Sequence, residues 1–313
     1  MQKLKKIRLS KIPSVMTAAL ISTSLFLHAA PPPPLAADYI YEVTSDTGSK
    51  SYIFGSVHYT MSSFPIRLGT CTKKILTEVD LVYLEASQLA ARSMTPDAVK
   101  TIEMSVVANE MEQPRVNLLS KIFFGNDQPS DIIRLRDLDV GVVIAALRKK
   151  IFEKSKSIGV IDYAPDAEIE LTSRFLDKPL DFIETPEEQL YFHKIIRPKD
   201  LSLVIDDLID IFQDKNTDTR IYREFSEQIR SAAVGEEAGL VEDISSPSYQ
   251  YDRATIYARN ESMTKKVAAI ISNSNKTKFI ALGAAHLAGE GGVIQRLRTA
   301  GFTAKRLCKQ PND

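Results

Sequence analysis

The chain has 313 residues, of which 44% are hydrophobic and 26% are charged, and forty basic residues balance forty acidic ones. This composition is that of an ordinary globular protein with enough apolar residues for a sizeable core. Because there is no net charge and no basic run beyond the N-terminal segment, we do not expect nucleic-acid binding. No Gly-x-Ser-x-Gly, HExxH or Walker-type motif is present, so the sequence carries none of these common hydrolase and nucleotide-binding signatures.

The N-terminal segment has the pattern of a secretory signal. Basic residues between positions 3 and 11 precede an apolar stretch over 15–27, which is too short for a transmembrane helix. The four prolines at 31–34 then predict a stiff, extended tether. We expect residues 1–37 to be signal and tether, residues 38–313 to form one domain, and the protein to be periplasmic or secreted. Contact with a membrane is expected only if the signal stays uncleaved.

The only two cysteines, Cys71 and Cys308, are far apart in the sequence and cannot form a local CxxC motif. In an oxidising compartment they could form one disulfide that closes a long loop. The alternative is a pair of buried free thiols, since the sequence does not show whether their Cα atoms approach closely enough.

Short apolar runs with polar ends predict the strands of a sheet. The first two runs are separated by an Asp-Thr-Gly turn at 46–48, which is typical of a β-hairpin. The predicted strands are 39–44, 52–57, 81–84, 180–183, 279–282 and 302–307.

Between these strands the apolar spacing is helical. Residues 201–211 and 256–270 each place their apolar side chains on one helix face. Thr185 and Glu188 are spaced as a capping box at the start of another helix. We therefore expect an α/β fold of the mixed α+β kind, with a central mixed sheet from both chain ends, flanking helices and a large helical insertion at about 90–275.

Two histidines share one local context, which is a predicted strand, a glycine, two small residues and the histidine. The two motifs are Gly55-Ser56-Val57-His58 and Gly283-Ala284-Ala285-His286, and Glu85 directly follows a third predicted strand. Functional groups in an α/β sheet project from the carboxyl ends of strands, so His58, Glu85 and His286 could converge at one edge. Two imidazoles and one carboxylate are the ligand set of a catalytic metal with an open position for water.

The same three residues allow two other interpretations. Without a metal, Glu85 could act as a general base on water while a histidine polarises the substrate or protonates the leaving group. Each histidine could also be a core residue with satisfied hydrogen bonds beside a tight turn.

Four further polar residues are candidates for lining the site. Asn260 falls within the apolar stripe of a predicted helix, next to Arg259, and buried polar groups need partners. Glu184 and Asp162 each follow a short apolar run. We expect Arg259, Asn260, Asp162 and Glu184 to contact substrate. The alternative for Asn260 is a bond to the backbone, and for Glu184 and Asp162 it is a capping or solvated position.

At these residues the sequence resembles the TraB/GumN family, whose eukaryotic relatives include the Tiki membrane proteases and whose wider superfamily includes the erythromycin esterases. The resemblance covers nearly the whole chain after the signal and is carried by residues 55–58, 80–85, 159–189, 259–260 and 282–287. It implies a metal-dependent peptidase or related hydrolase in which His58, His286 and Glu85 are the essential groups. Ser56 stands where threonine is more usual and keeps the hydroxyl.

We therefore expect an exported metal-dependent hydrolase that acts on peptide or protein substrates through a metal-activated water. His58, Glu85 and His286 would hold a divalent ion, and manganese, cobalt and zinc all suit this donor set. The alternative is a non-catalytic periplasmic protein of the same fold that binds a peptide or signal without turnover.

Overall fold

The computed structural model describes residues 34–57, 65–86, 102–154, 165–185, 188–189, 196–216, 227, 229–240 and 246–308. The chain divides into two units, Met1–Pro31 and Pro32–Asp313, and all described residues belong to the second. The predicted signal lies outside the described residues. None of the helices described is both long enough and apolar enough to cross a membrane.

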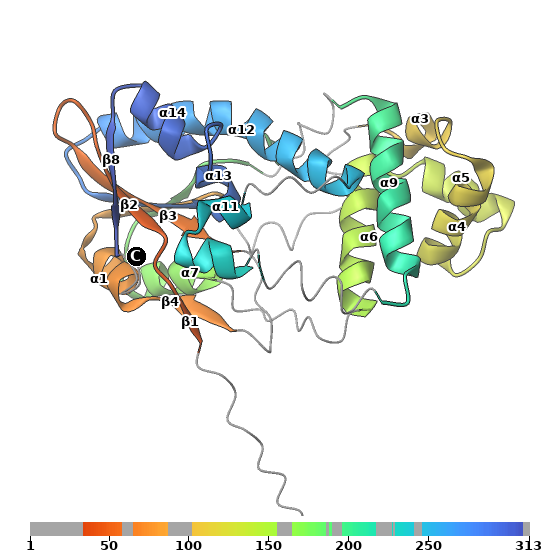
Figure 1. The fold of residues 1–313 in the computed structure, drawn as a ribbon, viewed down its shortest axis with the longest axis horizontal. Coiled ribbons are helices and arrows are strands. Elements are labelled where there is room, and N and C mark those ends of the chain that lie inside the picture. The colour runs from red at the N-terminus through yellow and green to blue at the C-terminus, as the bar shows by residue number, and fades with distance from the viewer. Residues whose placement is uncertain are drawn as a thin grey trace, which may run out of the picture. The chain divides into compact units, whose positions relative to one another are not determined.

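The second unit contains a mixed sheet of six strands (Figure 1). In spatial order its strands are β6 (Leu180–Phe182), β5 (Leu81–Leu84), β7 (Lys278–Gly283), β3 (Lys50–Ser56), β2 (Ile40–Thr44) and β8 (Thr303–Leu307). The first four are parallel, whereas β2 is antiparallel to both of its neighbours. The predicted α/β fold, with a mixed sheet built from both ends of the chain, is confirmed.

The hairpin predicted at the start of the sheet is present as β2 and β3, with Thr44 opposite Lys50. Its turn closes through a hydrogen bond from the Ser45 amide to the Ser49 carbonyl at 3.0 Å. Gly48 has a φ of +83°, which glycine adopts without steric cost. Turn chemistry therefore fixes the hairpin where the sequence predicts it.

The predicted N-terminal boundary needs a correction. Residues assigned to the end of the tether form strand β1 (Leu35–Ala37), which pairs in parallel with β4 (Ile66–Leu68). The Leu35 amide donates to the carbonyl of Pro65 at 2.9 Å, and Ala37 is fully buried. The folded domain thus begins before residue 38, because this apolar triplet finds a pairing partner some thirty residues later.

Helices occupy most of the described residues outside the strands (Figure 1). They are α1 (Thr70–Glu78), α3 (Met104–Ala108), α4 (Gln113–Phe124), α5 (Pro129–Arg136), α6 (Val140–Lys154), α7 (Pro165–Phe175), α9 (Pro198–Gln213), α11 (Glu237–Leu240), α12 (Pro247–Ser272), α13 (Ala284–Leu287) and α14 (Val293–Thr299). Where the structure describes the predicted insertion, it is largely helical, but it also contributes strand β6 to the sheet, and helix α7 packs on β5 and β6.

Helix α12 links the helical insertion to the sheet. It packs against α9 of the insertion and also against α13 and α14, which follow β7. Strand β7 is buried over its whole length, as expected for a central parallel strand covered on both faces. Its first residue, Lys278, donates to the carbonyls of Ile271 and Ser274 at the end of α12. Burial lowers the pKa of this lysine, and the two carbonyls compensate part of that cost.

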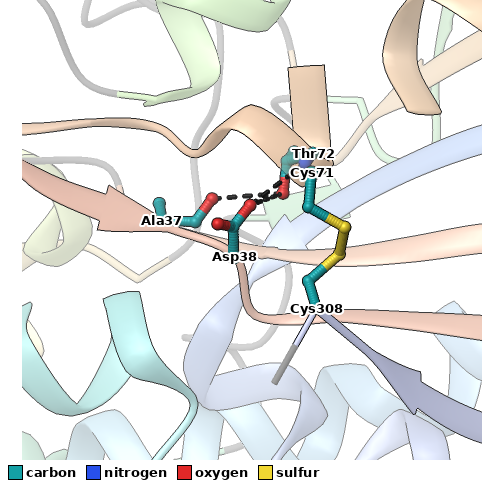
Figure 2. Close-up of a disulfide and its surroundings, with 5 residues drawn as sticks. All are labelled: Ala37, Asp38, Cys71, Thr72 and Cys308. Carbon is teal, nitrogen blue, oxygen red and sulfur yellow. Dashed lines mark hydrogen bonds between the residues drawn. A yellow bond between two sulfur atoms is a disulfide. The ribbon is translucent and has the colours of Figure 1, made fainter. Parts of the chain in front are cut away.

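A disulfide joins Cys71 to Cys308 across 237 residues of sequence, with Cα atoms 5.9 Å apart (Figure 2). Cys71 lies in the first turn of α1, and Cys308 directly follows the edge strand β8. The adjacent Thr72 donates its hydroxyl to Asp38 Oδ1 at 2.8 Å and its amide to the same oxygen at 3.0 Å. The start of α1 is thereby tied both to the N-terminal strands and to the last strand of the sheet.

Candidate active site

Three neighbouring parallel strands, β6, β5 and β7, end at one edge of the sheet. Leu84 lies opposite both Phe182 and Ala281, so the residues that follow these strands are side by side. Glu85 follows β5, and Glu184 lies two residues beyond β6 and donates its amide to the Glu85 carbonyl at 2.9 Å. His286 is in the short helix α13, which begins directly after β7. All three side chains are buried at this edge.

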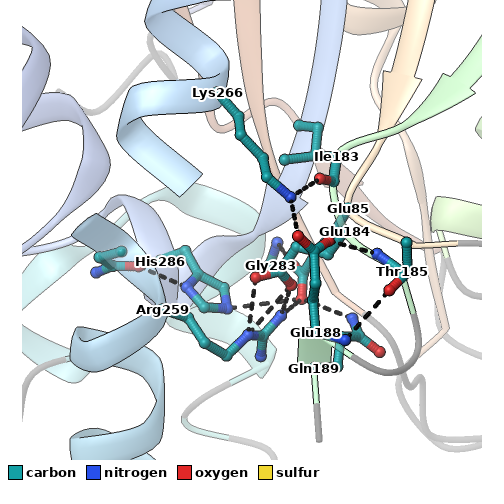
Figure 3. A network of polar contacts seen from close by, with 11 residues as sticks. Glu85, Ile183, Glu184, Thr185, Glu188, Gln189, Arg259, Lys266, Gly283 and His286 are labelled. Atoms are coloured by element: carbon teal, nitrogen blue, oxygen red, sulfur yellow. Dashed lines mark hydrogen bonds and ion pairs between the residues drawn. The ribbon is translucent and has the colours of Figure 1, made fainter. Parts of the chain in front are cut away.

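Arg259, in the middle of α12, connects the two glutamates (Figure 3). Its Nε lies 3.1 Å from Oε2 of Glu184, and its Nη2 donates to both Glu85 and Glu184. Burial by itself would lower the pKa of this guanidinium. The charge of Glu85 and the hydrogen bonds and charge of Glu184 outweigh burial and raise the pKa, so Arg259 stays charged. One cation therefore compensates two carboxylates that would be costly to bury alone.

The Glu85 carboxylate is oriented by two further donors. Its Oε2 accepts the backbone amide of Gly283 at 2.7 Å, and its Oε1 lies 3.5 Å from Nε2 of Gln189. Gly283 is the first residue of the second Gly-x-x-His motif, so this motif supplies an amide donor as well as a histidine. The carboxylate is thus held from both sides of the strand edge.

The capping box predicted at Thr185 and Glu188 is confirmed. The Thr185 amide donates to Glu188 Oε2 at 2.9 Å, and the Glu188 amide donates to Thr185 Oγ1 at 3.2 Å. Lys266 of α12 reaches the same place and donates to Glu188 at 2.6 Å and to the Ile183 carbonyl at 2.9 Å. These contacts fix the segment that carries Glu184 and Gln189 against α12.

The protonation of His286 follows from its contact with Asn260. Asn260 is fully buried, and its Nδ2 donates to the carbonyl of Gly291 at 2.9 Å. Its Oδ1 therefore faces Nδ1 of His286, at 2.6 Å, and can only accept. Nδ1 must carry the proton, and in a neutral imidazole Nε2 is then an unprotonated acceptor.

That Nε2 atom lies 3.6 Å from Oε1 of Glu85. When the imidazole is neutral, its Nε2 lone pair and the carboxylate oxygen face each other at this distance, where a shared cation, a water or a proton can lie between them. Zinc binds histidine nitrogen and carboxylate oxygen at about 2.0–2.2 Å, so two such donors on one tetrahedral ion lie about 3.4 Å apart. The spacing and chemistry of Glu85 and His286 therefore fit two ligands of one metal ion.

A cavity of about 380 Å³ adjoins these side chains. Its wall includes Arg259 and Gln189, which both contact Glu85, and Ala285, which precedes His286. The remaining wall comes mainly from the first half of α12. This cavity gives a ligand-sized space beside residues that contact Glu85.

Two of the predicted site residues, His58 and Asp162, lie outside the described residues. Within the ranges that are described, no three His, Cys, Asp or Glu side chains come close enough together to hold a metal ion. The structure brings Glu85, Glu184, Arg259, Asn260 and His286 together, from four segments between positions 85 and 286.

Sequence reasoning missed three contributors, Gln189, Lys266 and the tyrosines of the cavity wall. Gln189 directly follows the capping-box glutamate, so the predicted helix start could have placed it beside the strand end. The spacing of Lys266, seven residues after Arg259, puts both on nearly one face of α12. The cavity tyrosines carry no comparable local signal.

Comparison with known proteins gives one match. A search of curated proteins and a search of solved structures found no significant similarity. The model of the TraB/PrgY/gumN family matches residues 39–306, which include the described strands β2 to β7 and the whole carboxylate and imidazole cluster. The chain belongs to the TraB/PrgY/gumN family.

Proposed function

We propose that this chain is an exported metal-dependent hydrolase that cleaves peptide or protein substrates. The observation that carries the proposal is the pair of acceptors formed by His286 Nε2 and Glu85 Oε1, 3.6 Å apart beside a cavity. Glu85 and His286 would hold a divalent ion together with the predicted third ligand, His58. When bound, the ion would acidify a water and polarise a carbonyl.

The surrounding residues have distinct tasks in this proposal. Asn260 uses both ends of its amide, for His286 and for Gly291, so we assign it to orienting the histidine. This revises its predicted role as a substrate contact. Glu184 is likewise buried against Arg259, and we assign it to holding that guanidinium in place.

Arg259 is the residue of this cluster best placed to meet substrate. It lines the cavity and binds the glutamates through Nε and Nη2, and its Nη1 has no acceptor within the described residues. A charged N–H at this position would stabilise negative charge that develops on a carbonyl oxygen during attack. Because two carboxylates hold the guanidinium in place, it would need little movement to stabilise this charge.

Export is the second part of the proposal. The N-terminal sequence has the signal pattern described above, and the disulfide between Cys71 and Cys308 suits a protein that folds in an oxidising compartment. Detection of the mature protein in periplasmic or culture fractions, with the N-terminus located by mass spectrometry, tests this part. Retention of the full chain in the cytosol would contradict it.

The central experiment measures bound metal and peptide cleavage for the wild type and for His58→Ala, His286→Ala and Glu85→Gln. Each variant should lose metal and activity. Glu168→Gln is the matched control, because Glu168 also accepts a backbone amide, that of Leu68, and pairs with a lysine, Lys73, yet belongs to a different part of the fold. The hydrolase proposal fails if the three site variants retain the metal content and cleavage rate of the control.

One observation favours a second candidate, a non-catalytic protein that captures a peptide. Oε1 of Glu85 already accepts a hydrogen bond from Arg259, so the carboxylate could serve structure alone. In that case the wild type, supplied with manganese, cobalt or zinc, would bind peptides without cleaving them. The Glu85→Gln variant would then bind peptides as the wild type does.

A further inference from the structure

The cavity beside the cluster has an unusual concentration of aromatic rings. Tyr249, Tyr251 and Tyr257, all on α12, line it together with the apolar side chains of Ile256 and Leu240. Its volume of about 380 Å³ lies in the range of pockets that enclose small ligands, about 300–1,000 Å³. It is therefore large enough for a bulky side chain with part of its flanking backbone.

The charges of the wall largely cancel. Three arginines line the cavity, namely Arg148, Arg253 and Arg259. Three carboxylates lie against two of them, because Asp252 pairs with Arg148 at 2.5 Å and Glu85 and Glu184 pair with Arg259. Among the described residues at and beside the wall, three arginines are accompanied by three carboxylates, so we expect shape and aromatic surface to contribute more to binding than net charge does.

Two of the arginine guanidinium groups lie near the tyrosine rings of the wall. Arg148 lies 5.8 Å from the ring centroid of Tyr251, and Arg253 lies 5.5 Å from that of Tyr257. Planar guanidinium groups and tyrosine rings both offer faces or edges to a further ring. An aromatic guest would thus find stacking partners on more than one wall.

The ring of Tyr257 is held in place by a glycine. A Cβ atom at Gly291 would lie 3.0 Å from Cδ1 and Cε1 of Tyr257, so the ring packs directly on the backbone of this loop. The Gly291 carbonyl accepts from Asn260, which in turn binds His286. The position of the aromatic wall is therefore fixed relative to the imidazole.

From this arrangement we propose that the cavity binds an aromatic side chain of a peptide, next to the bond presented to Glu85 and His286. This deepens the proposed function and rests on it. The cavity is lined by Arg259 and Gln189, which both contact Glu85, and by Ala285, which precedes His286, so a peptide anchored by its ring would bring its backbone close to these two residues. The substrate class is a peptide with phenylalanine, tyrosine or tryptophan beside the cleaved bond.

The test uses short peptides of glycine, serine and alanine that differ in one central residue, which is tryptophan, phenylalanine, leucine, glutamate or alanine. The protein contains no tryptophan, so the fluorescence of the tryptophan peptide reports its own binding without interference. We expect the aromatic peptides to bind about tenfold or more tightly than the alanine peptide, as burial and stacking of one ring suggest. With metal supplied, kcat/KM should follow the same order, and mass spectrometry should locate cleavage beside the aromatic residue.

Two variants test the wall itself. Tyr257→Ala and Ile256→Ala should each reduce the preference for aromatic peptides by raising KM, while metal content stays at the wild-type level. Tyr83→Ala is the matched control, because Tyr83 lies in β5 and is not part of the cavity wall. Circular dichroism of each variant shows whether it is folded, and the peptide series with the wild type stands even if a variant is not.

The outcomes separate the two proposals. Cleavage with equal kcat/KM for all peptides, or with a preference for glutamate, would overturn the aromatic inference and leave the hydrolase proposal intact. Tight binding of aromatic peptides without cleavage, in protein that holds metal, would overturn the hydrolase and support the cavity assignment. Neither binding nor cleavage of any peptide would overturn both.

Discussion

Nδ1 of His286 donates to Oδ1 of Asn260 at 2.6 Å, and this contact determines which imidazole nitrogen faces Glu85. The direction of the bond is set by the other end of the amide, because Nδ2 of Asn260 is committed to the Gly291 carbonyl. A fully buried residue on α12 thus controls the tautomer of a residue that follows β7.

Replacing Asn260 by alanine should therefore weaken metal binding without removing a ligand. Loss of a partner that orients a ligating histidine costs about 10–100-fold in metal affinity. It also leaves the His286 N–H without Asn260 as its acceptor, which should lower the free energy of unfolding by about 1–3 kcal/mol, whereas the Gly291 carbonyl keeps the donor of Arg296. Equilibrium dialysis with zinc and urea unfolding of the metal-free protein measure the two effects.

Asn260→Asp distinguishes orientation from simple packing. Aspartate keeps an acceptor for His286 but loses the donor to Gly291, so its metal affinity should lie between those of the wild type and Asn260→Ala. If Asn260→Ala binds zinc as tightly as the wild type, then Asn260 does not position His286 for a metal.

Arg259 should be the largest single electrostatic contributor to stability in the cluster. Arg259→Ala leaves Glu85 and Glu184 buried without their cation, and such a change costs about 3–5 kcal/mol. Arg259→Lys should restore only part of this, because an ammonium cannot reproduce the planar set of bonds to both carboxylates. Urea unfolding gives the free energies.

The control for this prediction is Arg197→Ala. Arg197 also makes two hydrogen bonds to a carboxylate, that of Asp200, but on the exposed surface, where screening by water makes the pair weak. Arg197→Ala should therefore lower the free energy of unfolding much less than Arg259→Ala does. Equal losses in the free energy of unfolding would mean that burial does not strengthen the ion pairs of Arg259.

The pair formed by Lys266 and Glu188 should make stability depend on pH in acid. The hydrogen bond from Lys266 is the largest influence on Glu188 and lowers its pKa below the ordinary value of 4.5. Because the pKa is lower in the folded state, this contribution is fully present above about pH 4.5 and disappears as the pH falls through the folded-state value. Both side chains are about one-third or more exposed, so it amounts to about 1 kcal/mol or less.

Lys266→Met tests this by urea unfolding across the acidic range. The difference from the wild type should shrink as the pH falls, down to a constant remainder from the lost bond to the Ile183 carbonyl. Glu188→Gln removes the titrating group. The difference in free energy of unfolding between this variant and the wild type should also shrink as the pH falls. A difference that is constant with pH for both variants would contradict the assigned pair.

The parts of the fold that sequence predicted well are those fixed by local chemistry. The hairpin has its turn residues, β5 and β7 are short apolar runs, and the Thr185 and Glu188 cap is a local exchange of bonds. Glu85 and His286 could be predicted to meet, because Glu85 directly follows β5 and His286 comes three residues after the end of β7, the parallel neighbour of β5.

The features that the sequence did not predict depend on contacts between distant parts of the chain. Strand β1 has three residues with no alternation, and only its pairing with β4 makes it a strand. Glu184 and Arg259 are 75 residues apart, and nothing local in the sequence indicates that they pair. The cavity likewise depends on distant segments, because residues of α6, α11 and α13 line it together with those of α12.

The disulfide should contribute substantially to stability because it closes a very long loop and secures an edge strand. Cys71 and Cys308 are 237 residues apart, and cross-links of this kind contribute about 2–5 kcal/mol, chiefly by restricting the unfolded chain. Among the described strands, β8 pairs with only β2, so the bridge to α1 also limits fraying at this edge. The double variant Cys71→Ser and Cys308→Ser should therefore unfold at a lower urea concentration. Its amide hydrogens in β8 should exchange faster than in the wild type, whereas those in β7 should exchange only through global unfolding. The wild type treated with reductant should behave like the double variant, which separates the cross-link from the effect of the substitutions. Exchange in β8 that is unchanged in both would show that pairing with β2 alone holds the edge of the sheet.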